Sequence, residues 1–203
     1  MRFWITQLVV FLLLIISVFF FDQPLTKWCA GLSPDIHTFA NNFSWLIAPE
    51  VYFVALPILF LLYFYLFGEK KARILLFFIV GVACAILATD LLKVLFGRTR
   101  PMEWLTQHYY GFAWFGTSEL FWSFPSGHAT AIGSIMGTIA HFRPKYLHVV
   151  LIVAILLSFA RVIGLDHFFS DTLAGVFMGF LVTRWSSQLL EKLSRQSSKR
   201  SGS

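Results

Sequence analysis

Six apolar runs, separated by short polar segments, occupy most of this 203-residue chain. An α-helix needs about 20 residues, with a range of about 17–25, to cross the hydrocarbon core of a bilayer. Only 13% of the chain is charged, against about a quarter in a soluble domain. The sequence therefore predicts an all-α polytopic membrane protein, with six transmembrane helices in one domain over residues 1–193. The runs are 3–21, 51–67, 74–92, 129–142, 147–164 and 172–190.

The first run lies where a signal peptide would lie. Its apolar stretch is longer than the 7–15 residues typical of a signal peptide. It also ends at Phe20, Phe21 and Asp22, without the small residues of a cleavage site. We therefore predict that it stays in the protein as the first transmembrane helix.

The fourth run, 129–142, is the shortest and the least apolar. It approaches a spanning length only if its helix begins inside the preceding Pro-Ser-Gly-His segment, 125–128. Its small residues, including Gly133 and Gly137, would let helix backbones approach closely. This pattern predicts the buried central helix of the bundle. The alternative is a re-entrant segment, which would change the topology.

Lysine and arginine residues are unevenly distributed over the linkers. With six spans, one side of the membrane holds 11 of the 16, and the positive-inside rule makes that side cytoplasmic. Both termini are then cytoplasmic. The last segment, 194–203, is polar and basic and is predicted to be a disordered tail.

Two extracytoplasmic linkers carry further patterns. Ser33, Pro34 and Asp35 are typical of a helix start, and apolar residues at helical spacing follow them. They predict a short amphipathic helix along the membrane interface. The second linker, 102–123, is rich in aromatic residues. It is either an ordinary aromatic belt at headgroup depth or a loop that guides a lipid into a site.

Three polar stretches stand at the ends of apolar runs: 93–101 (KVLFGRTRP), 125–128 (PSGH) and 161–171 (RVIGLDHFFSD). The alternation of six spans places all three on the extracytoplasmic side. Together they hold several cations, two histidines and a carboxylate. Such a group of donors suits a phosphate group, because phosphoryl transfer needs mainly positioning and charge stabilisation.

The third stretch holds the strongest candidates. An arginine near a helix centre costs about 2.5–3.5 kcal/mol on insertion scales, so Arg161 is predicted to be functional; a structural ion pair with Asp90 or Asp171 is the alternative. His167 and Asp171 are four residues apart and would share a helix face. The carboxylate would orient the imidazole and leave its other nitrogen able to attack an electrophile. A capping aspartate beside an interfacial histidine is the alternative, and Asp166 is a competing partner.

The second stretch opens the fourth helix. Ser126, Gly127 and the exposed amides of a helix N-terminus form an anion site, and His128 is suited to protonate a leaving oxygen. A serine-capped turn would explain the same residues without any chemistry.

In the first stretch, Lys93 and Arg100 are seven residues apart. They would share a face of a helix that continues as far as Pro101. The alternative is that basic residues here complement the helix dipole. We assign Arg98 to that structural interpretation, as a charge at headgroup level.

No metal, cofactor or nucleic-acid partner is predicted. Cys29 and Cys84 belong to separate segments and indicate neither a disulfide nor a metal site. The acidic residues form no cluster suited to Mg²⁺, so the cations would supply the positive charge. The net charge of +6 lies mostly in the predicted cytoplasmic linkers.

The three stretches resemble the signature motifs of the type 2 phosphatidic acid phosphatase family. The first is Lys-x6-Arg-Pro, the second Pro-Ser-Gly-His, and the third Arg-x5-His-x3-Asp. The third motif usually begins Ser-Arg, whereas Ala160 precedes Arg161 here. That missing hydroxyl is expected to weaken a phosphate contact or helix packing, without removing a proton-transfer group.

The resemblance implies a metal-independent mechanism. His167 would attack phosphorus and form a phosphohistidine, with Asp171 orienting it. His128 would protonate the leaving group and then activate water. The phosphoryl oxygens would be held by Lys93, Arg100, Arg161, Ser126 and the Gly127 amide. Vanadium haloperoxidases share this constellation but are soluble, so that activity is not expected.

The resemblance also implies a lipid phosphatase of a bacterial inner membrane, with its site facing the periplasm or the outside. Undecaprenyl pyrophosphate, phosphatidylglycerol phosphate, phosphatidic acid and lipid A phosphates are all candidate substrates. One alternative is a phosphotransferase that passes the phosphoryl group to another lipid. Another is a non-enzymatic anion channel or lipid transporter, which would have no use for an oriented histidine.

Overall fold

The computed structural model describes residues 2–46 and 48–200, and its regular structure is helical, which confirms the all-α prediction. The longer helices are α1 (Arg2–Ile16), α2 (Asp22–Ala30), α3 (Pro34–Leu46), α4 (Pro49–Phe67), α5 (Glu69–Phe96), α7 (Gly127–Phe142), α8 (Leu147–Ser158) and α10 (Phe169–Arg200). The short elements are the π-helix η1 (Ser17–Phe21), α6 (Pro101–Gln107), the 3₁₀ turns η2 (Glu119–Phe121) and η3 (Pro144–Tyr146), and α9 (Ala160–Ile163).

Every predicted apolar run lies in helix, apart from Phe159 and Gly164 in the fifth. Three stretches of the described chain are long and apolar enough to cross a membrane: Gln7–Ala30, Leu75–Phe96 and Pro144–Ile163. A shorter apolar helix covers Ala55–Phe67. These stretches support a membrane protein, and the full count of six spans stays a prediction.

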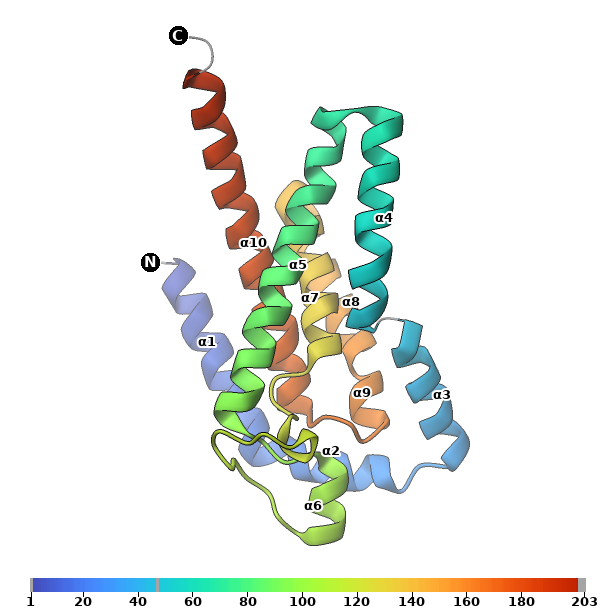
Figure 1. Cartoon of the computed structure of the whole chain (residues 1–203). Helices are drawn as coiled ribbons and strands as arrows, with labels where there is room; N and C mark the ends of the chain where they lie inside the picture. Colours follow the sequence, from blue (N-terminus) through green and yellow to red (C-terminus); the bar gives the residue numbers. More distant parts are fainter. Residues whose placement is uncertain (1, 47, 201–203) are drawn as a thin grey trace.

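Helix α7 lies at the centre of the bundle, between α5, α8 and α10 (Figure 1). It begins at Gly127, inside the Pro-Ser-Gly-His segment, and is 16 residues long. Most of its residues are buried, which confirms the predicted central helix. Its small residues set the contact with α10: a Cβ added to Gly133 would lie 2.1 Å from the carbonyl oxygen of Val176. The two backbones therefore touch.

Substitution of Gly133 by alanine is expected to destabilise the fold by more than about 1–3 kcal/mol, the usual range for overpacking, because the obstacle is backbone. Gly111→Ala is the matched control, since the nearest atom to its added Cβ lies 3.8 Å away. Thermal unfolding in detergent measures both. An unchanged midpoint for Gly133→Ala would contradict the close contact between α7 and α10.

Helices α2 and α6 and the loop before α7 gather at the end of the molecule opposite the C-terminus (Figure 1). The starts of α7 and α10 and the end of α5 lie at the same end. The three polar stretches therefore come together at one end of the bundle, as the alternation of helices predicts.

The predicted amphipathic helix is α3, which begins at Pro34. Ala40 and Ser44 are buried, whereas Phe39 and Trp45 are exposed. Its placement at a membrane interface stays a prediction, and Ile47 lies outside the described residues. Helix α10 continues to Arg200, through most of the segment for which the sequence predicts disorder.

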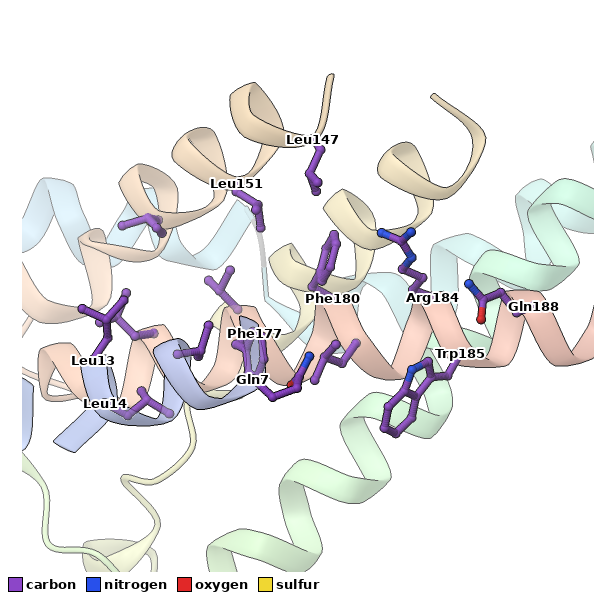
Figure 2. Close-up of a pocket in the computed structure, with 15 residues that line it drawn as sticks. Gln7, Leu13, Leu14, Leu147, Leu151, Phe177, Phe180, Arg184, Trp185 and Gln188 are labelled. Carbon is purple, nitrogen blue, oxygen red and sulfur yellow. The ribbon is translucent and has the colours of Figure 1, made fainter. Parts of the chain in front are cut away.

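A cavity of about 560 Å³ lies between α1, α8 and α10 (Figure 2). Leucine and phenylalanine side chains line most of it, and Arg184 and Gln188 lie toward one end, whereas Gln7 lies near Phe177. None of the predicted site residues lines this cavity. It is therefore distinct from the candidate phosphate site.

Candidate active site

The first stretch leaves α5 at a left-handed glycine. Gly97 has φ 55° and its amide donates to the carbonyl oxygen of Lys93, an αL helix end that glycine favours. The prediction that Lys93 and Arg100 share one continuous helix is therefore wrong. Lys93 lies in the last turn of α5. Arg100 follows the break, and Pro101 begins α6 rather than ending a helix, in keeping with the preference of proline for the first helical position.

Asp166 joins the first and third stretches. Its Oδ2 lies 3.2 Å from Nη1 of Arg161, and its Oδ1 lies 3.9 Å from Nη1 of Arg100. The alternative interpretation of Arg161 is a structural ion pair with Asp90 or Asp171, whereas the structure gives an ion pair with Asp166. Asp90 instead lies 3.2 Å from Nζ of Lys93. Asp166 therefore holds two of the predicted phosphate-binding cations near each other.

The second stretch contributes the N-terminus of α7. Ser126 is the N-cap, and its Oγ accepts from the amide of Ala129 at 3.4 Å. Its own amide donates to the carbonyl oxygen of Asp171 at 3.1 Å, which joins the second and third stretches. The amides of Gly127 and His128 have no acceptor within the described residues. His128 lies within electrostatic range of Arg161, Lys93 and Arg100. The helix end thus presents donors among the cations.

His167 is oriented by a backbone carbonyl. Its Nδ1 lies 2.7 Å from the carbonyl oxygen of Ser123. A carbonyl oxygen only accepts, so Nδ1 carries the proton and Nε2 of the neutral ring keeps its lone pair. Burial, with the nearby positive charges of Arg161 and Arg100, lowers the pKa of His167 well below its usual value. The imidazole is therefore neutral near pH 7 and able to act as a nucleophile.

Asp171 does not bond His167 directly, and the predicted hydrogen bond between them is wrong. Helix α10 begins at Phe169, so His167 precedes it and the two do not share a helix face. The Oδ2 atom of Asp171 accepts from Ser123 Oγ at 2.6 Å and from the Phe168 amide at 2.8 Å. Asp171 therefore reaches the imidazole of His167 through Ser123, and through the Phe168 amide it also holds the backbone next to His167.

Arg98 is buried, and its assignment as a charge at headgroup level is wrong. Its exposed fraction is 0%. Its Nη2 lies 2.7 Å from Oδ2 of Asp22, and its Nη1 bonds Oδ1 of Asp171. Nη1 also donates to Ser170 Oγ at 2.6 Å, and Nη2 to the Tyr110 hydroxyl at 2.9 Å. One guanidinium thus joins two buried carboxylates.

Sequence reasoning missed five residues of this network: Asp22, Arg98, Tyr110, Ser123 and Ser170. One signal was present in the chain. Asp22 closes an apolar run, and Arg98 stands beside motif residues on the same predicted side of the membrane. Two oppositely charged side chains that are both removed from water can lower the free-energy cost of desolvation by pairing with each other.

The aromatic linker is tied to the end of α5. The amides of Ala113, Trp114 and Phe115 donate to the carbonyl oxygens of Gly97, Phe96 and Leu95 at 2.8–3.1 Å. These bonds use carbonyls that a helix end leaves unpaired. Trp114 and Phe115 have positive φ, 41° and 56°, and are 56% and 70% exposed. Their exposure fits both the aromatic belt and the lipid-guiding loop.

The fold is a helical bundle of a membrane protein, with cations and two histidines gathered at one end. The sequence model of the PAP2 superfamily matches residues 72–195, more than half of the chain. The chain belongs to the PAP2 superfamily, and the resemblance to type 2 phosphatidic acid phosphatases is confirmed.

Two relatives named lipid A 1-phosphatase match over 93 residues, which is 46% of this chain. The protein of Rhizobium johnstonii is 38% identical, and that of Rhizobium etli is 36% identical. The matched segment spans only 38% and 40% of the lengths of those two relatives.

Two crystal structures share the fold. LpxE of Aquifex aeolicus has a TM-score of 0.60 and 20% identity, and the match covers 82% of this chain and 94% of that one. The PAP2 type phosphatidylglycerolphosphate phosphatase of Bacillus subtilis has a TM-score of 0.64 and 20% identity, with coverage of 91% and 96%. At 20% identity these likenesses establish the architecture alone.

Proposed function

We propose that this protein is an integral-membrane lipid phosphatase that hydrolyses a phosphomonoester or pyrophosphate of a lipid. The observation that carries this proposal is the state of His167. Its Nδ1 proton is held by the Ser123 carbonyl, which leaves the Nε2 lone pair among the charges of Arg161 and Arg100. A lone pair surrounded by cations is suited to attack a phosphoryl group.

The proposed reaction has two steps. Nε2 of His167 attacks phosphorus and the bond from phosphorus to the lipid oxygen breaks. His128, in the cationic form that the bound phosphate dianion stabilises, gives that oxygen a proton. His128, now neutral, then takes a proton from water, whose oxygen attacks the phosphohistidine. Phosphate leaves and His167 is restored. The predicted phosphate ligands are Lys93, Arg100, Arg161, Ser126 and the Gly127 amide.

For Ser126 the structure supports a modified role. Its Oγ accepts from the Ala129 amide, so it serves as the helix cap that the sequence offered as the alternative. A capping hydroxyl still has its own proton to donate. We propose that it gives this proton to a phosphoryl oxygen while it keeps the end of α7 in place.

We also propose that the site faces the extracytoplasmic side of a bacterial inner membrane, with both termini in the cytoplasm. The uneven distribution of Lys and Arg supports this orientation. The three polar stretches gather at the end opposite the C-terminus (Figure 1), so a cytoplasmic C-terminus puts them outside. An even number of spans, such as the predicted six, puts both termini on one side of the membrane.

Among the four candidate lipids, we favour a lipid A phosphate. Both sequence relatives carry the name lipid A 1-phosphatase, whereas the structural likenesses do not separate the candidates. A phosphotransferase is the second candidate, and it differs only in the acceptor that attacks the phosphohistidine. The oriented imidazole argues against a transporter.

Incubating the purified protein with each candidate lipid in detergent, with EDTA present, tests this function. We expect phosphate release, fastest from lipid A phosphates, because the cations supply the charge stabilisation that a metal would otherwise provide. The His167→Ala variant, purified in the same way, controls for contaminating phosphatases. Release that is lost in EDTA and restored by Mg²⁺ would contradict the metal-independent mechanism.

A further inference from the structure

We propose that Asp22 and Arg98 are positioning residues, which fix the imidazole of His167 through Asp171 and Ser123. Asp22 lies outside the three motifs of the sequence, and Arg98 occupies one of the unspecified positions of the first. The role as a positioner of a nucleophile rests on the proposed function. The set of bonds that carries it is a property of the fold and is testable without any activity.

The first link joins α2 to Arg98. Asp22 is the first residue of α2 and is fully buried. Its Oδ2 accepts from Nη2 of Arg98 at 2.7 Å, and its Oδ1 accepts from the amide of Ser170 at 2.8 Å. The Ser170 hydroxyl donates to the same carboxylate. Asp22 is thereby fixed to the loop after α5 and to the start of α10.

The second link joins Arg98 to α10. Its two terminal nitrogens point to different carboxylates, Nη2 to Asp22 and Nη1 to Asp171. A planar guanidinium that is bonded on both arms has little freedom to rotate. Movement of Asp22 would therefore be passed to Asp171.

The third link ends at the imidazole. Ser123 is held at two points: its Oγ donates to Asp171 at 2.6 Å, and its amide donates to the carbonyl oxygen of Arg98 at 3.1 Å. Its own carbonyl oxygen then accepts from Nδ1 of His167 at 2.7 Å. Arg98 thus controls Ser123 through both its side chain and its backbone.

The hydrogen bond from Nδ1 of His167 to the Ser123 carbonyl oxygen decides the chemistry, because it selects the tautomer of the imidazole. With the proton on Nδ1, Nε2 has the lone pair that attacks phosphorus. If the Ser123 carbonyl shifts away, the Nε2–H tautomer becomes accessible, and that form has no lone pair at the attacking position. All five linked residues are buried, with exposed fractions of 0–4%. The bonds therefore act in a low dielectric, where each is strong.

The test uses Asp22→Asn, which keeps the size of the side chain and removes its charge. Asp35→Asn is the matched control, since Asp35 is an exposed carboxylate in the first turn of α3. We expect Asp22→Asn to lower kcat by about 10- to 100-fold, the effect of a misplaced reacting group, with KM within about twofold of the wild-type value. Asp35→Asn is expected to change neither constant.

The second readout needs no substrate. In protein labelled with ¹⁵N-histidine, the ring nitrogen shifts of His167 report its tautomer, and the His167→Gln spectrum assigns them. We expect the Nδ1–H form in the wild-type protein and a mixture of tautomers in Asp22→Asn. Ser170→Ala removes the hydroxyl that contacts both Asp22 and Arg98. It is expected to shift the mixture in the same direction, and it takes the place of Asp22→Asn if that variant does not fold.

The outcomes separate the two proposals. An unchanged tautomer in the folded variants overturns the positioning role, whether or not kcat falls. So does a wild-type spectrum in which Nε2 carries the proton. The wild-type protein could instead show the expected tautomer, with a change in the variants, and yet release no phosphate from any lipid tested. That result would contradict the proposed function and leave the positioning geometry in place.

Discussion

Phosphate release is expected to fall by at least about 10³-fold when His167 is replaced by alanine, because the substitution removes the attacking atom. The backbone carbonyl of Ser123 loses one hydrogen bond, whereas the cations and the α7 N-terminus stay in place. Substrate binding should therefore survive, and KM is expected to change far less than kcat. Initial rates of phosphate release, recorded over a range of lipid phosphate concentrations in detergent, give both kcat and KM.

The matched control is His148→Ala, since His148 is an exposed histidine on α8. It should leave the rate unchanged. A His167→Ala variant that releases phosphate at the rate of the control would show that the nucleophile lies elsewhere. The proposed function would then lose the observation that supports it best.

His128→Ala separates the two histidines. With an aryl phosphate, whose leaving oxygen needs no proton, this variant should still form the phosphohistidine at His167. Hydrolysis of that intermediate should be slow, because no base activates water. Labelled phosphate is therefore expected to stay on the protein after a quench in base. Rapid turnover without labelled protein would contradict the assignment of His128.

The positions of the helices follow from the apolar runs, because a run of about 20 apolar residues has few other ways to satisfy its backbone in a bilayer. The small residues of the fourth run correctly predicted the close contact, in which Gly133 meets the backbone of Val176. The gathering of three polar stretches at one end follows from the alternation of helices. These features depend on sequence patterns that are local.

The bonds within the site were not predictable in the same way. The expected contact between His167 and Asp171 assumed a helix that includes both, whereas α10 begins at Phe169. A shift of two residues in a helix boundary was enough to replace a side-chain partner by the Ser123 carbonyl. Gly97 likewise ends α5 four residues before Pro101, which removed the predicted shared face of Lys93 and Arg100.

The burial and pairing of Arg98 were not predicted from the sequence for a different reason. Its partner Asp22 lies 76 residues away, and each of the two residues is at a helix end where a single charge is commonly solvated. Packing of α2 against the start of α10 removes water from both, together with the rings of Tyr110, Phe112 and Phe168 beside the guanidinium. The sequence shows only that both lie near the ends of apolar runs on the same predicted side, and this alone does not distinguish a buried pair from two independent surface charges.

The same burial gives Arg98 a large expected effect on stability. Replacing Arg98 with methionine leaves the carboxylates of Asp22 and Asp171 buried without their cation, and removal of one partner from a buried ion pair costs about 3–5 kcal/mol. Arg98→Lys should recover only part of this, because one ammonium does not reproduce a guanidinium bonded on two arms. Unfolding in mixed detergent micelles measures the free energy of each variant.

Arg143→Met is the matched control, since Arg143 is exposed and its guanidinium bonds only the neighbouring carbonyl of Phe142 in the described chain. It should change stability by less than about 0.5 kcal/mol. Adding Asp22→Asn to Arg98→Met should restore part of the loss, because one of the two unpaired charges disappears. This recovery would appear as a coupling energy of about 0.5–3 kcal/mol. An Arg98→Met protein as stable as the control would mean that Arg98 does not pair with Asp22 and Asp171 in a water-free environment, and the route from α2 to His167 would be lost with it.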